Sequence, residues 1–279
     1  MNEKGIELKN LNIKYSVYDM GRGIVLPEMS NELAYLCGIL AGDGHISKNY
    51  NGKSRNRIIC GGNPSNEKEF YDKLITSLFK KVFNIDINSK LLGNRTYGFQ
   101  FGSQAIVYFL TKIIGLPRGK KYATLKIPPL FFQDKGLLLS FVKGVFDTDF
   151  GFCLCKKYKE IPYYPQMAFA SRSKKFTMEI WRALKELGLR FDGKVYRVFD
   201  KDDRAKKGFT ITYRFDLYGH KYLIKILKII KLRHTKHIKK LEEWERANRT
   251  NKKVLRLAGE GFEPLVSITN EAIDPTFGL

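Results

Sequence analysis

The sequence is poor in acidic residues, cysteine and histidine, and it has no long apolar run. Its 28 Asp and Glu residues are outnumbered by 50 Lys and Arg, which gives a formal net charge of +22 at pH 7. Charge of this size makes nucleic acid the leading candidate partner and a membrane surface its rival. Because no apolar run approaches the roughly 20 residues of a membrane span, and no signal peptide is recognisable, we expect a soluble intracellular protein without a membrane partner.

The sequence gives little support for a function that depends on thiols, histidines or a bound nucleotide. The four cysteines, Cys37, Cys60, Cys153 and Cys155, match no common zinc-ligand spacing. Free thiols in a reducing interior are the simple interpretation. No Gly-rich phosphate loop is present, so we expect no nucleotide cofactor.

One short stretch occurs twice, at residues 36–44 and 142–151. Each copy is typical of an apolar helix whose last turn carries an acidic residue, Asp43 in the first and Asp149 in the second. One such copy is weak evidence, because Gly and Ala are common in apolar helices. Two copies at half-chain spacing indicate an internal duplication.

Small residues recur four positions apart in both copies, as Gly38 and Gly42 and then as Gly144 and Thr148. Residues at this spacing share a helical face, and small side chains let two helices approach closely. If the copies pack together, their two acidic residues meet at one end. Two neighbouring carboxylates repel unless a cation lies between them, so the pattern predicts a divalent metal site. The alternative is a small-residue packing seam in an ordinary helical core.

The spacing of apolar residues predicts helix, two strands, helix, two strands, helix, and then the same order again. The expected class is α+β, with two pseudo-symmetric αββαββα halves. The first half is expected to have a helix from about Ser30, strands at 44–50 and 55–61, a helix at 65–82, strands at 86–92 and 96–101, and a helix at 103–114. The second half is expected to have a helix at 135–148, strands at 152–158 and 164–170, a helix at 173–187, strands at 194–199 and 210–217, and a helix at 221–230. The expected divisions are an N-terminal extension (1–27), a first half (28–117), a linker (118–134), a second half (135–240), and a basic helix with a C-terminal tail (241–279).

The two motifs resemble those of the LAGLIDADG homing endonucleases, in the form that carries both motifs in one chain. The resemblance covers residues 28–240. It implies a monomer in which curved antiparallel sheets form a DNA-binding saddle and the motif helices pack at the centre.

The resemblance implies that Asp43 and Asp149 each help to bind a metal ion, assisted by the backbone carbonyls of Gly42 and Thr148. Hard oxygen ligands suit Mg²⁺, for which Mn²⁺ substitutes in the test tube. The family also carries a basic residue near the metals. Lys121 is the first choice for it, Lys120 is the second, and Lys236 is the loose counterpart in the other half.

The second motif departs from the family pattern at Phe150, where the family usually has Gly. Gly151 is expected to supply the turn one residue later, and a distorted second site is the alternative. Asp147 is a further acid in this motif, but it lies two residues before Asp149 and points elsewhere on a helix. We expect it to have a packing or capping role.

One face of each sheet should be polar, because polar and apolar residues alternate along strands such as 210–217. Asn and Gln pair with adenine, and Arg and Lys with guanine, in a major groove that admits a two-stranded ribbon. The alternative for each polar residue is a merely solvated side chain. The candidate DNA contacts are Ser47, Asn49, Asn51, Arg57, Lys90, Gln100, Lys157, Gln166, Thr212 and Arg214.

These observations predict a site-specific DNA endonuclease that makes metal-dependent double-strand breaks and is encoded by a mobile intron. One alternative is a DNA-binding regulator that keeps the scaffold without cutting. The other is an RNA-binding intron maturase, for which the basic stretch 228–256 is suitable.

Overall fold

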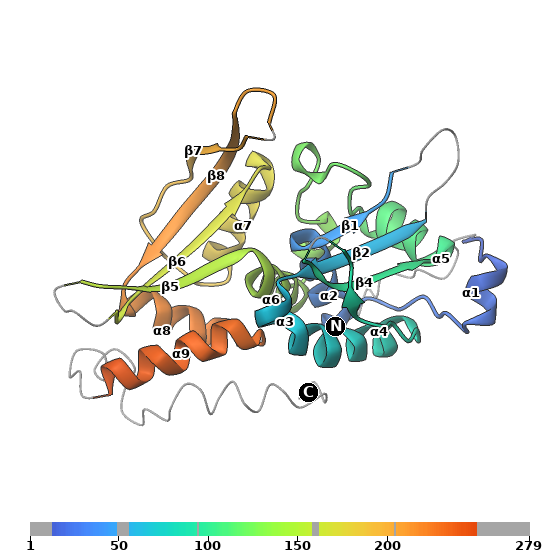
Figure 1. Ribbon diagram of the computed structural model, residues 1–279, viewed down its shortest axis with the longest axis horizontal. Helices are drawn as coiled ribbons and strands as arrows, with labels where there is room; N and C mark the ends of the chain where they lie inside the picture. Colours follow the sequence, from blue (N-terminus) through green and yellow to red (C-terminus); the bar gives the residue numbers. More distant parts are fainter. Residues whose placement is uncertain (1–12, 49–55, 94, 158–161, 204, 250–279) are drawn as a thin grey trace. The chain divides into compact units, whose positions relative to one another are not determined.

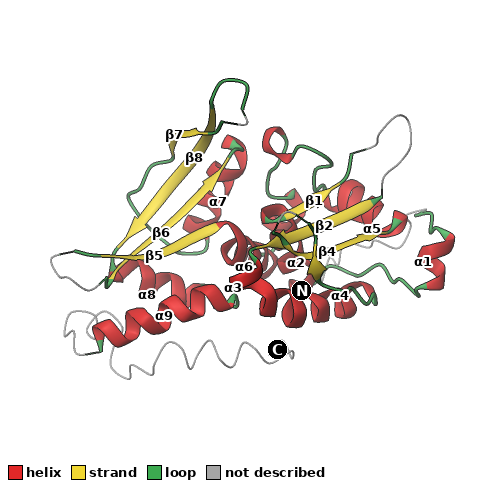
Figure 2. Cartoon of the chain, in the orientation of Figure 1, coloured by secondary structure: helices red, strands yellow, loops and turns green. Residues whose placement is uncertain are grey.

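The computed structural model of the chain describes residues 13–48, 56–93, 95–157, 162–203 and 205–249 (Figure 1). Its helices and strands form two compact units, each with its own four-stranded antiparallel sheet (Figure 2). One unit extends to Lys120 and includes Pro128–Phe141, and the other contains Lys121–Ile127 and the chain from Val142 onward. Every helix of the described residues is too short or too polar to span a bilayer.

The first unit begins its repeat with helix α2, and its sheet has the strand order β1-β2-β4-β3. A long helical segment, formed by α3, a π-helical turn and α4, separates the two strand pairs. The bounds are α2 (Asn31–Gly42), β1 (Gly44–Ile46), β2 (Arg57–Gly62), α3 (Pro64–Glu69), η1 (Phe70–Ile75), α4 (Thr76–Phe83), β3 (Lys90–Leu91), β4 (Tyr97–Gly102), α5 (Gln104–Tyr108) and η2 (Phe109–Ile114).

The second unit repeats this order, and its sheet has the equivalent strand order β5-β6-β8-β7. Short 3-10 turns at Lys121–Ala123 and Pro129–Gln133 precede its motif helix. The bounds are α6 (Lys135–Asp149), β5 (Phe150–Cys155), β6 (Tyr164–Ser171), α7 (Lys174–Glu186), β7 (Tyr196–Lys201), β8 (Phe209–Tyr218) and α8 (His220–Ile229). Helix α6 begins in the first unit and enters the second at Val142. The predicted pair of αββαββα halves is therefore confirmed, whereas the saddle and the central packing of the motif helices stay predictions.

Helix α2 is buried at every position from Leu33 to Gly42. A helix that is apolar on all sides has to be buried, because no face of it suits water. Its start, expected at about Ser30, is fixed by that residue as N-cap, because the Ser30 Oγ accepts a hydrogen bond from the N–H of Leu33 at 3.2 Å. The helix can therefore carry a polar group only near its ends.

Several predicted boundaries differ from the structure. The helix expected at 65–82 begins after Asn63, which is its N-cap, and Pro64 occupies the first turn, where a missing N–H costs nothing. The strand expected at 86–92 is reduced to Lys90–Leu91. The strand expected at 152–158 begins earlier, at Phe150, directly after α6.

Two helices lie outside the repeat, α1 (Val17–Gly21) before it and α9 (Thr235–Asn248) after it. Asp19 of α1 is fully buried, and its Oδ2 accepts hydrogen bonds from the N–H groups of Gln104 and Ala105 at 3.1 and 3.2 Å. Burial raises the pKa of Asp19, but the hydrogen bonds outweigh this effect and hold the pKa below its usual value. This carboxylate attaches the N-terminal helix to the start of α5.

Asp147 has the equivalent role in the second unit. Its side chain is 1% exposed, and its Oδ1 accepts hydrogen bonds from the backbone N–H groups of Arg233 and His234, both at 3.1 Å. These residues immediately precede α9, so the carboxylate attaches that helix to α6. The expected capping role of Asp147 agrees with this geometry.

We predict that Asp147→Ala lowers the free energy of unfolding by about 3 kcal/mol, because it leaves one buried and one partly buried N–H group without an ionised acceptor. Asp147→Asn retains an acceptor and should lose less. Denaturant unfolding followed by circular dichroism measures both changes. Asp203→Ala, at a side chain that is 85% exposed, is the matched control and should change stability by no more than about 0.5 kcal/mol. Equal losses in Asp147→Ala and the control would contradict this role.

Candidate active site and nucleic-acid interface

The two motif acids occupy the same place in their units, between the motif helix and the first strand. Helix α2 ends at Gly42, Asp43 is its C-cap, and β1 begins at Gly44. Asp149 is the last residue of α6, and β5 follows directly. Both acids are partly accessible to solvent. Each unit therefore presents one carboxylate where its buried helix emerges, and the meeting of the two acids stays a prediction.

The surroundings of Asp43 include a buried tyrosine that the sequence did not single out. Burial raises the pKa of Tyr71 far above its usual value, and the nearby Cys60 and Asp43 add to the rise. The Tyr71 hydroxyl lies 3.7 Å from the Cys60 sulfur, and Glu67 also acts on it electrostatically. Tyr71 directly follows Phe70, which begins the apolar stripe of its helix. The spacing of apolar residues therefore predicts only that Tyr71 packs in the core.

The surroundings of Asp149 are positively charged. Burial raises the pKa of Asp149 to about 6, although some solvent still reaches the residue. The positive charges of Lys121 and Lys236 oppose this rise. With a pKa near 6, the carboxyl is mostly ionised at neutral pH and is available to a cation. The structure thus brings two of the three candidate lysines within electrostatic reach of Asp149, whereas Lys120 is exposed and belongs to the first unit.

The acids fit a metal ion that takes most of its ligands from elsewhere. Within the described ranges, no group of three or more His, Cys, Asp or Glu side chains is arranged to hold a metal ion. The Thr148 hydroxyl donates within its own helix, to the carbonyl oxygens of Gly144 and Val145 at 3.1 and 3.2 Å. Single carboxylates completed by water and substrate phosphate oxygens are the usual Mg²⁺ arrangement. The backbone carbonyls of Gly42 and Thr148 stay predicted ligands.

Phe150 is accommodated by the core of the second unit. In the first unit, a Cβ atom at Gly44 would lie 2.5 Å from the carbonyl oxygen of Leu40, so no side chain fits there. The Phe150 ring is 4% exposed and stacks on Phe146, with ring centroids 3.5 Å apart. Gly151 lies on the exposed side of β5 without a positive φ, so it does not supply the turn that the sequence led us to expect.

The exposed face of the first sheet gathers four of the candidate DNA contacts. Gln100 lies opposite Ile59, and Arg57 lies two positions further along β2 on the same face. Lys90 lies opposite Gly98, two positions from Gln100. Ser47 continues β1, with its N–H donating to the carbonyl oxygen of Arg57 at 2.9 Å. Asn49 and Asn51 lie outside the described residues.

The exposed face of the second sheet carries Gln166, Thr212 and Arg214, and their side chains already have partners. Arg214 forms an ion pair with Asp216, with Nη2 2.6 Å from Oδ1. The Thr212 hydroxyl donates to Asp200 at 2.6 Å. The Gln166 amide donates to the hydroxyl of a neighbouring tyrosine at 3.2 Å. Contacts from these side chains to DNA bases would compete with these bonds. The alternation of polar and apolar residues along the strand did not reveal this competition.

Lys157 is placed beside this sheet, just after β5. Its Nζ lies 4.3 Å from the centroid of the Tyr164 ring, so the ammonium makes a cation–π contact. Such a contact is worth about 0.5–1 kcal/mol at an exposed site. It orients the lysine without neutralising its charge.

We predict that Lys121→Gln raises the pKa of Asp149 above about 6, because it removes a positive charge that favours the carboxylate. The ionised fraction of Asp149 at a given pH then falls, and metal binding requires a higher pH. A ¹³C NMR titration of the Asp149 carboxyl measures the shift directly. Lys120→Gln removes the same charge one residue earlier and should leave this pKa unchanged. A shift in Lys120→Gln with none in Lys121→Gln would reverse the assignment of the two lysines.

No protein-family model matches the sequence, and no curated protein matches it. Among solved structures, a mesophilic variant of the homing endonuclease I-DmoI is 17% identical over 72% of this chain and 89% of its own, with a TM-score of 0.45. The LAGLIDADG meganuclease I-AabMI, bound to uncleaved DNA, is 9% identical over 90% of this chain and 100% of its own, with a TM-score of 0.49. The LAGLIDADG homing endonuclease I-GzeII, in complex with its DNA target, is 10% identical over 83% and 97%, with a TM-score of 0.43. Two of these three structures are thus LAGLIDADG proteins, and the third is a homing endonuclease.

Proposed function

We propose that this chain is a site-specific endonuclease of double-stranded DNA, of the LAGLIDADG homing type, encoded by a mobile intron and active as a monomer. The observation that carries the proposal is the duplicated junction of buried helix, acidic residue and strand. It occurs once in each unit, at Asp43 and at Asp149. A duplex has two strands to cut, and one carboxylate in each unit supplies one metal ligand for each cut.

Duplex DNA as the substrate is supported by charge and by the exposed sheet faces. The net charge of +22 favours a polyanion. Arg57, Lys90 and Gln100 lie on one open face, and a strand pair of this kind fits a major groove. Because the corresponding face of the second unit carries different residues, we expect an asymmetric target whose two half-sites differ.

The chemistry assigned to the chain is phosphodiester hydrolysis. Asp43 and Asp149 would hold Mg²⁺, for which Mn²⁺ substitutes, and the bound ion would supply an activated water and charge stabilisation at the leaving oxygen. Lys121 and Lys236, whose positive charges act on Asp149, would stabilise the negative charge that develops on the phosphate. The two sheet faces hold the duplex so that each scissile phosphate meets one acid.

The first step of the test is to identify the target, by selecting the duplexes that the protein binds from a randomised pool. Cleavage of this target is then measured with Mg²⁺ and with EDTA. We expect discrete double-strand cuts that require the metal and that slow at least 100-fold in Asp43→Asn and in Asp149→Asn, while both variants still bind. Glu69→Gln, an exposed acid on α3, is the control and should cut like the unaltered protein.

Other outcomes would overturn the proposal. Tight binding without cutting in either metal would make the chain a DNA-binding regulator. Selection of structured RNA in preference to duplex DNA would favour the maturase. Cutting that continues unchanged in Asp43→Asn and Asp149→Asn would remove both acids from the site.

A further inference from the structure

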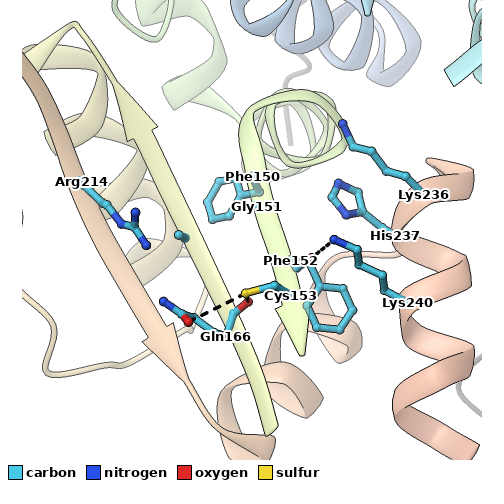
Figure 3. A pocket seen from close by; sticks show the side chains of 10 residues that line it. Phe150, Gly151, Phe152, Cys153, Gln166, Arg214, Lys236, His237 and Lys240 are labelled. Atoms are coloured by element: carbon cyan, nitrogen blue, oxygen red, sulfur yellow. Dashed lines mark hydrogen bonds between the residues drawn. The ribbon is translucent and has the colours of Figure 1, made fainter. Parts of the chain in front are cut away.

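The second unit contains a hollow of about 390 Å³ beside β5, the edge strand of its sheet (Figure 3). Its walls are the exposed sheet face, which supplies Gln166 and Arg214, and the first turns of α9, which supply Lys236 and Lys240. Three of the described residues that line the hollow are cationic, and none of these lining residues is acidic. Asp216 pairs with Arg214, but Lys236 and Lys240 add two further positive charges, so the wall favours an anion.

Lys240 is held in place at the rim of this hollow. It lies four residues after Lys236, so both side chains are on one face of α9. Its Nζ donates to the carbonyl oxygen of Phe152 at 2.5 Å, across the outer edge of β5 (Figure 3). A carbonyl carries no net charge, and an ammonium group has three donors, so this bond leaves the positive charge and two donors of Lys240 for another ligand.

Helix α9 is itself firmly attached, so its lysines are presented on a rigid element. His237 is 3% exposed and packs against α6 and β5, where the backbone of Phe146 is hydrogen-bonded to its ring. The fully buried Trp244 donates from Nε1 to His220 Nδ1 at 3.0 Å. The Asp147 cap fixes the start of the helix. A cation on a rigid support loses little conformational entropy when it binds a ligand.

We propose that this hollow is a phosphate seat, in which Lys240 binds a backbone phosphate of the duplex just outside β5. The inference rests on the proposed function and extends it to α9, which lies outside the duplicated repeat. Arg214 and Gln166 on the opposite wall face the adjoining nucleotides. A contact of this kind positions the duplex and reads no sequence, because every nucleotide carries the same phosphate.

The test is the salt dependence of DNA binding by Lys240→Gln, measured by fluorescence anisotropy on the selected target. Each phosphate neutralised on a duplex contributes about 0.9 to the slope of log K against log[salt]. A fourfold rise in salt, from about 50 to about 200 mM, should therefore weaken the unaltered protein about 3.5-fold more than it weakens the variant. Lys239→Gln makes the same charge change at an exposed neighbour that does not line the hollow, and it should keep the full slope.

Lys240 also caps an edge strand, so the variant is checked for a purely structural effect. Lys240→Arg keeps the charge and should restore the slope, whatever it does to the thermal midpoint. A slope in Lys240→Gln equal to that of the unaltered protein overturns the phosphate seat, while DNA binding itself, and with it the proposed function, still stands. Absence of any DNA binding by the unaltered protein overturns both.

Cys153 provides an independent probe, because it lines the hollow and is exposed, whereas Cys37 and Cys60 are buried. In a Cys155→Ser variant, we expect bound target duplex to slow the modification of Cys153 by a maleimide reagent at least fivefold. Adding Lys240→Gln to this variant should reduce that protection. Inorganic phosphate provides the second arm. Protection by millimolar phosphate but not by duplex would assign the hollow to a free phosphate ion and overturn the backbone contact.

Discussion

The structure depends on placing an acidic group at the end of a helix that is otherwise apolar. Helix α2 is buried at every residue from Leu33 to Gly42, so an ionised carboxylate inside it would be strongly destabilising. Asp43 avoids this cost because it caps the helix where the chain turns toward β1. The same fold that buries the helix therefore presents its acid at the junction with the sheet.

The two units surround this acid with different groups. Around Asp43, the Tyr71 phenol stays protonated because of burial and the nearby Cys60 and Asp43. Around Asp149, burial raises the pKa to about 6, and the charges of Lys121 and Lys236 limit the rise. A metal ion would favour the ionised form of either acid, as those lysines do for Asp149. The two motif acids thus differ in their neighbours, and cation binding by each of them stays a prediction.

Much of the fold was predictable because the apolar spacing of helices and strands is repeated in both halves. The helix start near Ser30 and the order of elements were confirmed, since both depend on the local pattern of residues. The shortened strand at Lys90–Leu91 and the inward ring of Phe150 were not, because each depends on packing against residues distant in the sequence. The candidate site likewise combines what local patterns predict with what only the folded structure shows. The alternation of polar and apolar residues along the strand placed Arg214 on the exposed face, but only the structure shows that Asp216 already holds its guanidinium.

The helices outside the repeat are attached by one physical device. A buried carboxylate, Asp19 for α1 and Asp147 for α9, accepts backbone N–H groups at a helix start. Hydrogen bonds to a charged acceptor are worth about 1.5–3 kcal/mol, enough to hold a short element against the repeat. Helix α9 held in this way carries Lys236 toward Asp149 and Lys240 toward the edge of β5. The lysines of the proposed site therefore depend on a carboxylate that takes no part in the chemistry.

The central claim is that each unit contributes one carboxylate to a metal site. Anomalous diffraction at the manganese edge, from crystals of the chain bound to its selected duplex and soaked in Mn²⁺, tests it most directly. We expect anomalous peaks within coordination distance of both Asp43 and Asp149, each also next to a phosphate oxygen of the duplex. A complex that binds DNA without a peak at either acid would contradict it.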